Sequence, residues 1–189
     1  MKGVDISENQ SYVDWDALQE EGVEFVIVRA GWGQGHKDEK FEEYANEALN
    51  RGFKVGAYWY SYALDTDAAR REGEYCREII DAWGGLLELP VFYDQEDADG
   101  WRGRNGINYN QCTDMCDAFA DGHGLRAGVY ANYDWFTNYL DYNYLKDRYV
   151  IWLAQYNSQP DLQCDIWQYS DKEWFGSQKL DADISYMEG

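Results

Sequence analysis

Two carboxylates follow a short apolar run in the segment Leu89–Gly100, LPVFYDQEDADG. The run Val91–Tyr93 predicts a buried strand, and because side chains alternate across a strand, Asp94 and Glu96 share one face of it. At a rise of ~3.3 Å per residue they are roughly 6–7 Å apart along the backbone. Carboxylates at the exit of a buried strand are costly to bury, and acid–base chemistry is a common reason for placing them there. The alternative is an acidic loop that caps the next helix.

Three further aspartates lie near the two ends of the chain: Asp5 in GVDIS, and Asp181 and Asp183 in LDADISY. In a closed barrel the first and last strands are neighbours, so these acids converge with Asp94 and Glu96 at one mouth. Converging carboxylates push their pKa values apart, which leaves one protonated near neutrality and the others ionised. Glycoside hydrolysis needs that division, because it uses an acid for the leaving oxygen and an anion beside the developing positive charge.

Other site chemistries fit the sequence less well. A carboxylate cage for Ca²⁺ or Mg²⁺ is the main competitor, but D-A-D-G at Asp97–Gly100 is too short for an EF-hand loop. A serine or cysteine nucleophile lacks a G-x-S-x-G turn, and neither His36 nor His123 lies at a predicted strand end. Cys112 and Cys116 share one face of a predicted helix, which indicates two small buried side chains rather than a zinc site. We therefore expect no metal and no cofactor.

Strand-like apolar runs alternate with helical patterns and predict a single domain over residues 1–189. The expected strands are Gly3–Ile6, Phe25–Ala30, Val55–Ala63, Val91–Glu96, Ala127–Ala131, Tyr149–Tyr156, Asp165–Tyr169 and Leu180–Tyr186. The expected helices are Val13–Glu21, Asp38–Arg51, a long one capped by Asp65 or Thr66, Asn108–Asp121 and Tyr133–Leu140, and residues 97–106 are expected to form a polar loop. This alternation predicts parallel strands with crossover helices, and the closely spaced late strands favour a barrel that is irregular at its end. No phosphate-binding glycine motif follows a strand, which disfavours nucleotide-binding sheets.

The composition excludes some partners. The chain carries 36 acidic and 16 basic residues, a net charge of -20, which argues against nucleic acid as a partner. No apolar run approaches the ~18 residues of a membrane span, and no signal peptide precedes the first strand, so we expect another export route or a leader already removed. The 17 Tyr and 9 Trp are typical of carbohydrate-facing and protein-facing surfaces. We expect a monomer.

Seven segments in order make the chain resemble the glycoside hydrolases of family 25, the Chalaropsis-type lysozymes or N-acetylmuramidases. They are GVDIS (3–7), FVIVRAGWG (25–33), VGAYWY (55–60), VFYDQE (91–96), IWLAQY (151–156), IWQYS (166–170) and LDADISY (180–186). The resemblance implies an irregular, flattened, TIM-like β/α barrel with parallel strands first and an irregular or antiparallel closing strand. It also implies hydrolysis of the β-1,4 bond between N-acetylmuramic acid and N-acetylglucosamine in peptidoglycan, at the cell wall and outside the cell.

The same resemblance assigns roles to the acids. Glu96 would be the general acid that protonates the leaving oxygen, and Asp94 an anion that orients the substrate N-acetyl group or stabilises positive charge. Asp5 would fill the acid position of the first strand. Asp181 matches the family's closing-strand aspartate better than Asp183, which stands where the family often has Asn. The route stays open between direct attack by water, with inversion, and attack by the substrate's own acetamide, with retention.

For the substrate groove we expect Tyr58, Tyr60, Trp152 and Gln168, with Tyr130 as a weaker candidate. For each aromatic residue the alternative is core packing. Two other functions remain open. One is a catalytically silent glycan-binding barrel, and the other is a hydrolase of chitin-like or other N-acetylated glycans.

Overall fold

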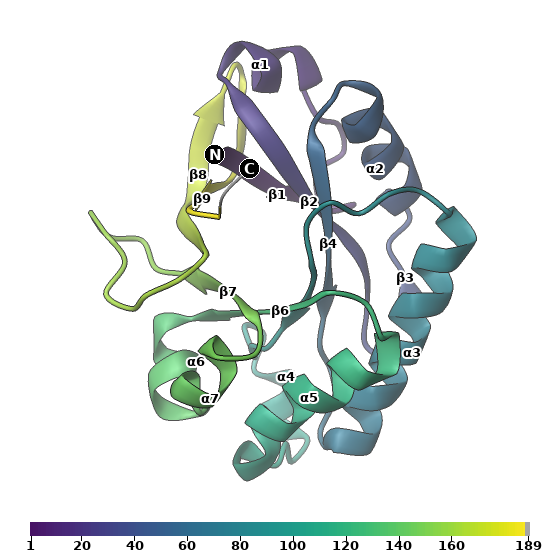
Figure 1. Cartoon of the computed structure of the whole chain (residues 1–189), viewed down its shortest axis with the longest axis vertical. Coiled ribbons are helices and arrows are strands. Elements are labelled where there is room, and N and C mark those ends of the chain that lie inside the picture. The colour runs from purple at the N-terminus through teal and green to yellow at the C-terminus, as the bar shows by residue number, and fades with distance from the viewer. Residues whose placement is uncertain (188–189) are drawn as a thin grey trace.

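The computed structural model describes residues 1–187, which form a closed barrel of eight strands surrounded by helices (Figure 1). The barrel strands are β1 (Lys2–Ile6), β2 (Val23–Trp32), β4 (Lys54–Tyr60), β5 (Val91–Asp94), β6 (Ala127–Asn132), β7 (Val150–Ala154), β8 (Ile166–Phe175) and β9 (Gln178–Ser185). The short β3 (His36–Lys37) pairs with β2 outside the closed ring.

The strands from β1 to β8 run parallel around the barrel, whereas β9 is antiparallel to both of its neighbours, β8 and β1. The predicted irregular barrel with an antiparallel closing strand is therefore confirmed. Because β9 fills the gap between β8 and β1, strands from the two ends of the chain lie side by side.

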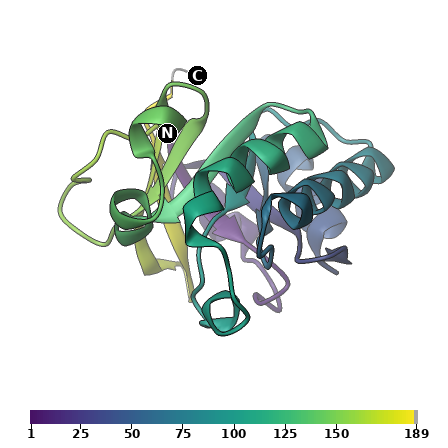
Figure 2. The same cartoon turned by 90° about the horizontal axis from the view of Figure 1, so that it is seen from below.

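Helices cover the barrel unevenly. They are α1 (Trp15–Glu20), α2 (Phe41–Asn50), α3 (Thr66–Trp83), α4 (Trp101–Arg104), α5 (Cys112–His123) with a preceding 3-10 turn η1 (Tyr109–Gln111), α6 (Tyr133–Asn138) and α7 (Tyr142–Lys146). Figure 2 shows α3 and α5 side by side along one flank. Their backbones approach closely at Gly73 and Gly122, where an added Cβ would lie 2.3 Å from the Phe119 carbonyl oxygen and 2.4 Å from the Arg70 carbonyl oxygen, respectively.

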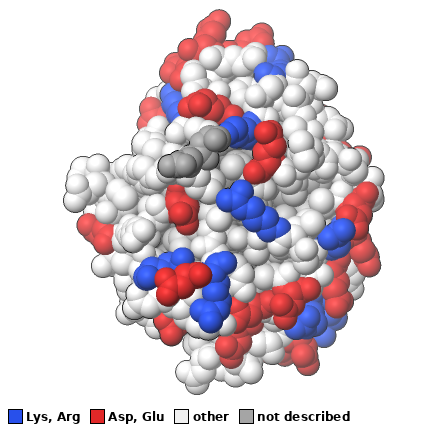
Figure 3. Space-filling model, in the orientation of Figure 1, with Lys and Arg blue, Asp and Glu red and all other residues white. Residues whose placement is uncertain are grey.

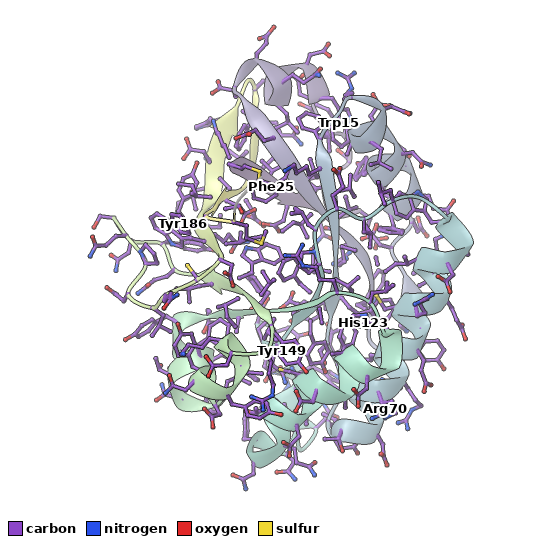
Figure 4. All side chains as sticks on the ribbon, viewed as in Figure 1. Trp15, Phe25, Arg70, His123, Tyr149 and Tyr186 are labelled. Carbon is purple, nitrogen blue, oxygen red and sulfur yellow. The ribbon has the colours of Figure 1, made fainter. Side chains whose placement is uncertain are left out.

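Two apolar layers follow from the alternation of side chains along the strands. Val4 and Ile6 of β1 point outward, into the layer that the helices cover. Gly3 faces inward, and its missing side chain leaves room for the Phe25 ring, which lies within the barrel (Figure 4). Phe25 belongs to a smaller inner cluster, which fills the barrel beneath its mouth and comprises Phe25, Ile27, Leu89, Phe92, Trp152 and Ile166. The barrel is thus a packed core with room for a site only at its end.

Some boundaries differ from the sequence expectations. The strand expected over Val91–Glu96 ends at Asp94, and the one expected over Val55–Ala63 ends at Tyr60. The helix expected from Asp38 begins at Phe41, and the Asp38 carboxylate accepts hydrogen bonds from Arg29 Nε and from the N–H of Lys40. The strand expected to end at Tyr169 continues to Phe175, and α7 was not predicted.

The segment expected to be a polar loop, residues 97–106, contains the short helix α4. The Asp97 carboxylate accepts hydrogen bonds from the N–H groups of Arg102 at 2.8 Å and Gly103 at 2.9 Å, and Asp99 accepts one from the N–H of Trp101 at 2.8 Å. These aspartates therefore stabilise the start of a helix. Both roles considered for this acidic stretch therefore occur in it. Asp97 and Asp99 cap a helix, whereas Asp94 and Glu96 face the pocket of the barrel.

None of the helices in residues 1–187 is long and apolar enough to cross a membrane.

Candidate active site

A pocket of about 200 Å³ opens at the carboxyl ends of the parallel strands. The residues that line it are Asp5, Asn9, Arg29, Tyr58, Tyr60, Asp94, Glu96, Tyr130, Trp152, Gln168 and Asp181. All eight residues predicted from the sequence as catalytic or substrate-contacting thus border one cavity. Larger pockets of about 430 and 580 Å³ lie near the starts of β5 and β6, but neither gathers inward-facing carboxylates, so we place the acid–base chemistry in the smaller one.

The strands bring acids from three parts of the sequence together. Asp5 of β1 lies opposite Asp181 of β9 in the strand register. Asp94 ends β5 and points inward, like Phe92 two residues before it. Glu96 lies beyond the strand yet still borders the pocket, whereas Gln95 between them points outward, toward α5.

Gln168 orders one side of the pocket. Its Nε2 donates a hydrogen bond to Asp5 Oδ2 at 2.7 Å, and its Oε1 accepts hydrogen bonds from the hydroxyls of Tyr130 and Tyr156, both at 3.1 Å. Because both ends of the amide have partners, its orientation is fixed. Gln168 therefore holds Asp5 in place, and Tyr130 is part of the site.

Trp152 forms the floor of the pocket. Only 1% of it is exposed, and the rings of Tyr130, Phe92 and Tyr58 surround it with centroids 4.6, 5.1 and 6.1 Å away. Its Nε1 donates a hydrogen bond to Asp183 Oδ1 at 2.8 Å. Asp183 is fully buried and does not border the pocket, whereas Asp181 does.

Asp94 and Glu96 behave as one titrating pair. Burial raises the pKa of Asp94 well above its ordinary value, and the charge of Glu96 and a hydrogen bond to Glu96 raise it further. Burial also raises the pKa of Glu96, but the hydrogen bond from Asp94 opposes that rise. The two carboxyls therefore titrate together, and their interaction favours the protonated form of Asp94 and the ionised form of Glu96.

The acids on β1 and β9 form a second group. Burial raises the pKa of Asp181 to about 6, with Asp171 adding to the rise, so Asp181 is an anion at neutral pH. Burial raises the pKa of Asp183 to about 8 and that of Asp5 well above its ordinary range. The carboxyls of the site thus have pKa values that are raised to different extents, as acid–base chemistry requires.

Arg29 and Asn9 border the pocket and were not predicted. Arg29 Nε donates a hydrogen bond to Asp38 Oδ2 at 2.8 Å, and Glu8 lies 3.6 Å from its Nη2. Of the described residues around the pocket, Arg29 is the only Lys or Arg. The available signal was a charged residue in the inward-facing register of β2, two positions after Ile27. Asn9 follows β1 in a turn, and nothing in its sequence position marks it.

The cysteines do not offer a nucleophile. Burial raises the pKa of Cys112 to about 11 and that of Cys164 to about 12, and it raises the pKa of Cys76 and Cys116 as well. All four remain protonated thiols near neutrality, and Cys112 and Cys116 are buried on α5 as predicted. Within residues 1–187 no cluster of three or more His, Cys, Asp or Glu side chains is arranged to hold a metal ion.

Comparisons with known proteins identify the family of the chain. Residues 4–177 match the sequence profile of Glycosyl hydrolases family 25. An "Autolytic lysozyme" of Clostridium acetobutylicum is 30% identical over 177 residues, covering 90% of this chain and 51% of that protein. An "N,O-diacetylmuramidase" of Arthroderma benhamiae is 27% identical over 146 residues, covering 73% of this chain and 60% of that protein. The chain thus spans between half and two thirds of the length of these relatives.

Solved structures have the same fold. A muramidase from Acremonium alcalophilum aligns with a TM-score of 0.83 at 22% identity, covering 100% of this chain and 94% of that one. The modular autolysin LytC from Streptococcus pneumoniae, solved with a synthetic peptidoglycan ligand, aligns with a TM-score of 0.85 at 23% identity, covering 98% of this chain and 46% of that one. With its profile matched over most of its length, the chain belongs to family 25 of the glycosyl hydrolases.

Proposed function

We propose that this chain is an N-acetylmuramidase, a lysozyme that hydrolyses the β-1,4 bond between N-acetylmuramic acid and N-acetylglucosamine in peptidoglycan. The observation that carries the proposal is the interacting Asp94–Glu96 pair at the mouth of the barrel, with Asp181 as an anion in the same pocket. The family membership and the names of the relatives, a lysozyme and a diacetylmuramidase, support the same activity.

In the proposed mechanism Glu96 is the general acid. Asp94 is almost fully buried, at 4% exposed, whereas Glu96 is the less buried member of the pair and the one nearer solvent. In this scheme a proton held by the pair passes from Asp94 to Glu96 and then to the leaving glycosidic oxygen, which leaves Asp94 as an anion beside the positive charge that develops on the sugar.

The remaining residues orient the substrate. Asp181, ionised at neutral pH, accepts a hydrogen bond from the attacking water or from the substrate acetamide, and Asp5 and Gln168 keep it in place across the strand pair. Tyr58 and Tyr60 line the wall and Trp152 the floor, so they contact the sugar bound next to the scissile bond. Every residue in this scheme comes from one chain, so a monomer that folds as a single catalytic domain suffices.

A digest of purified peptidoglycan analysed by mass spectrometry tests the activity. A muramidase leaves N-acetylmuramic acid at the new reducing ends. Reducing-end N-acetylglucosamine would show another bond specificity, and cleavage of chitin oligosaccharides but not peptidoglycan would show another substrate. Both results would overturn the proposal.

The Glu96→Gln variant separates an enzyme from a silent glycan-binding barrel. It keeps the size of the side chain but cannot donate a carboxyl proton, so turnover should fall at least about 100-fold while binding to peptidoglycan persists. A wild-type protein that binds the glycan without any turnover would support the silent barrel instead.

A further inference from the structure

Arg102 is a buried cation directly behind the catalytic pair. It lies in α4 and is 1% exposed. Its Nη1 donates hydrogen bonds to the Glu96 carbonyl oxygen at 2.9 Å and to Gln95 Oε1 at 2.5 Å, and its Nε donates one to the Ala63 carbonyl oxygen at 2.9 Å. A single side chain thus joins the segments that follow β4 and β5 to α4.

These contacts hold Glu96 where the sheet no longer does. β5 ends at Asp94, and the next peptide is anchored by a hydrogen bond from the Gln95 N–H to the Tyr130 carbonyl oxygen at 2.9 Å. The Glu96 carbonyl is then held by Arg102. Gln95 links these hydrogen bonds to α5, because its Nε2 donates a hydrogen bond to the Cys112 carbonyl oxygen at 2.8 Å.

The charge of Arg102 has no direct partner. Its hydrogen bonds go to carbonyl oxygens, an amide and the sulfur of Met115, and within the described part of the chain no carboxylate forms an ion pair with it. Burial of an uncompensated charge is very costly, so the balancing negative charge has to come from nearby buried acids.

Three acids lie within the electrostatic reach of the guanidinium: Glu72 and Asp94, which are buried, and Glu96, which is half-buried. Burial raises the pKa of each, and Arg102 opposes that rise in each. Glu72, whose pKa is raised to about 7, is only partly ionised near neutrality, so it balances only part of the charge. The rest falls on the Asp94–Glu96 pair.

From this arrangement we propose that Arg102 is the positioning residue of the Asp94–Glu96 pair: it fixes the Glu96 main chain and supplies the positive charge that favours ionisation of the pair. The proposal rests on the assignment of this pair as the acid of the reaction. If both carboxyls were protonated, the pair would lack the anion that the mechanism requires. If Glu96 were displaced, its carboxyl would no longer lie within hydrogen-bond distance of the leaving oxygen.

The test compares Arg102→Met, Arg102→Lys and the control Arg104→Met. Arg104 belongs to the same short helix but is exposed and donates only to the Asp99 carbonyl oxygen. The first measurement is a ¹³C NMR titration of the side-chain carboxyls in the folded, substrate-free protein, and the second is the pH profile of kcat on peptidoglycan.

Arg102→Met should raise the titration of the pair by about one pH unit or more, because an opposite charge has been removed, and should move the whole kcat profile to higher pH. Arg102→Lys keeps the charge but cannot reach all three acceptors, so it should lower kcat by about 10-fold while leaving the profile near that of the wild type. Arg104→Met should change neither measurement.

The proposal is overturned if folded Arg102→Met loses activity equally at every pH with unchanged carboxyl titrations, because the residue then acts only in packing. It is also overturned if Arg102→Lys shifts the profile as far as Arg102→Met does. Should Arg102→Met not fold, the double variant Gln95→Leu/Arg102→Met removes the buried polar pair together, which is far less costly than leaving one partner alone. If the wild type has no turnover, the muramidase assignment fails, while the titration still decides whether Arg102 governs the pair.

Discussion

Asp183 should destabilise the folded protein at neutral and alkaline pH, and its replacement by Asn should remove that cost. Asp183 is fully buried, with its Oδ1 accepting the hydrogen bond from Trp152 Nε1. Its Oδ2 finds no hydrogen-bond partner among the described residues. Asn has nearly the same shape, retains an oxygen for Trp152, and adds N–H groups that face the neighbouring acids Asp5 and Asp181.

The magnitude follows from the pKa. Burial raises the pKa of Asp183 to about 8 from an ordinary value of 3.8. Stability from this group is fully present below the ordinary pKa and is lost as the pH rises toward the folded pKa, because only the unfolded chain ionises in between. Each pH unit costs about 1.4 kcal/mol, so at about pH 7 the loss reaches roughly 4 kcal/mol. Asp5 and Asp181 share the titration, so we expect Asp183→Asn to be more stable than the wild type by about 2–4 kcal/mol at that pH.

Urea unfolding of both proteins between about pH 4 and about pH 8 measures the effect. The two free energies of unfolding should be similar at the acidic end and diverge steadily as the pH rises. Asp181→Asn serves as a comparison, because burial raises the pKa of Asp181 only to about 6. The stability that this variant gains over the wild type should therefore stop increasing at a lower pH. Parallel curves for wild type and Asp183→Asn would refute the reasoning, as would a variant that is less stable at high pH.

Three further outcomes are expected. Burial lowers the pKa of His123 to about 4, so the folded protein should lose roughly 3 kcal/mol of stability as the pH falls from about 6.5 to about 4. In urea unfolding, His123→Asn should reduce this loss of stability at acidic pH. An unchanged loss in the variant would contradict the prediction. Gly73→Ala should lower the free energy of unfolding by about 2 kcal/mol or more, because the added Cβ would lie 2.3 Å from the Phe119 carbonyl oxygen. An unchanged free energy of unfolding would mean that α3 and α5 can move apart at little cost. The net charge is -20, and acids gather along α3 and α5 in Figure 3. Electrostatic repulsion should therefore limit activity on anionic cell walls at very low salt, and activity should rise as salt is added. A steady fall in activity would show that repulsion does not limit it.

The placement of the acids could be predicted because it follows from two simple rules. Alternation along a strand puts Asp94 on the inner face, and closure of a barrel puts the first strand beside the last, which brings Asp5 to Asp181. Neither rule needs side-chain packing. The distinction between Asp181 and Asp183 did need it, because both point inward and only their depth in the barrel separates them.

The residues that support the site, Glu72 and Arg102, could not be predicted, because their positions depend on side-chain packing. Glu72 occupies one turn of an acidic, amphipathic helix, and its burial depends on the Tyr62 N–H, which donates to it at 2.9 Å from a different element. Arg102 lies in a glycine-rich segment that indicates a loop, and its three acceptors come from the ends of two strands. Such residues are defined by tertiary contacts between segments, and no local pattern in the sequence encodes them.

The pairing of β1 with β9 has a consequence for when the pocket becomes complete. The Asp5 and Asp181 positions are brought together only when β9, the last strand of the barrel, inserts between β8 and β1. Contacts between such distant segments form late and slowly in folding. While the chain is being synthesised, the pocket therefore stays incomplete until β9 closes the barrel.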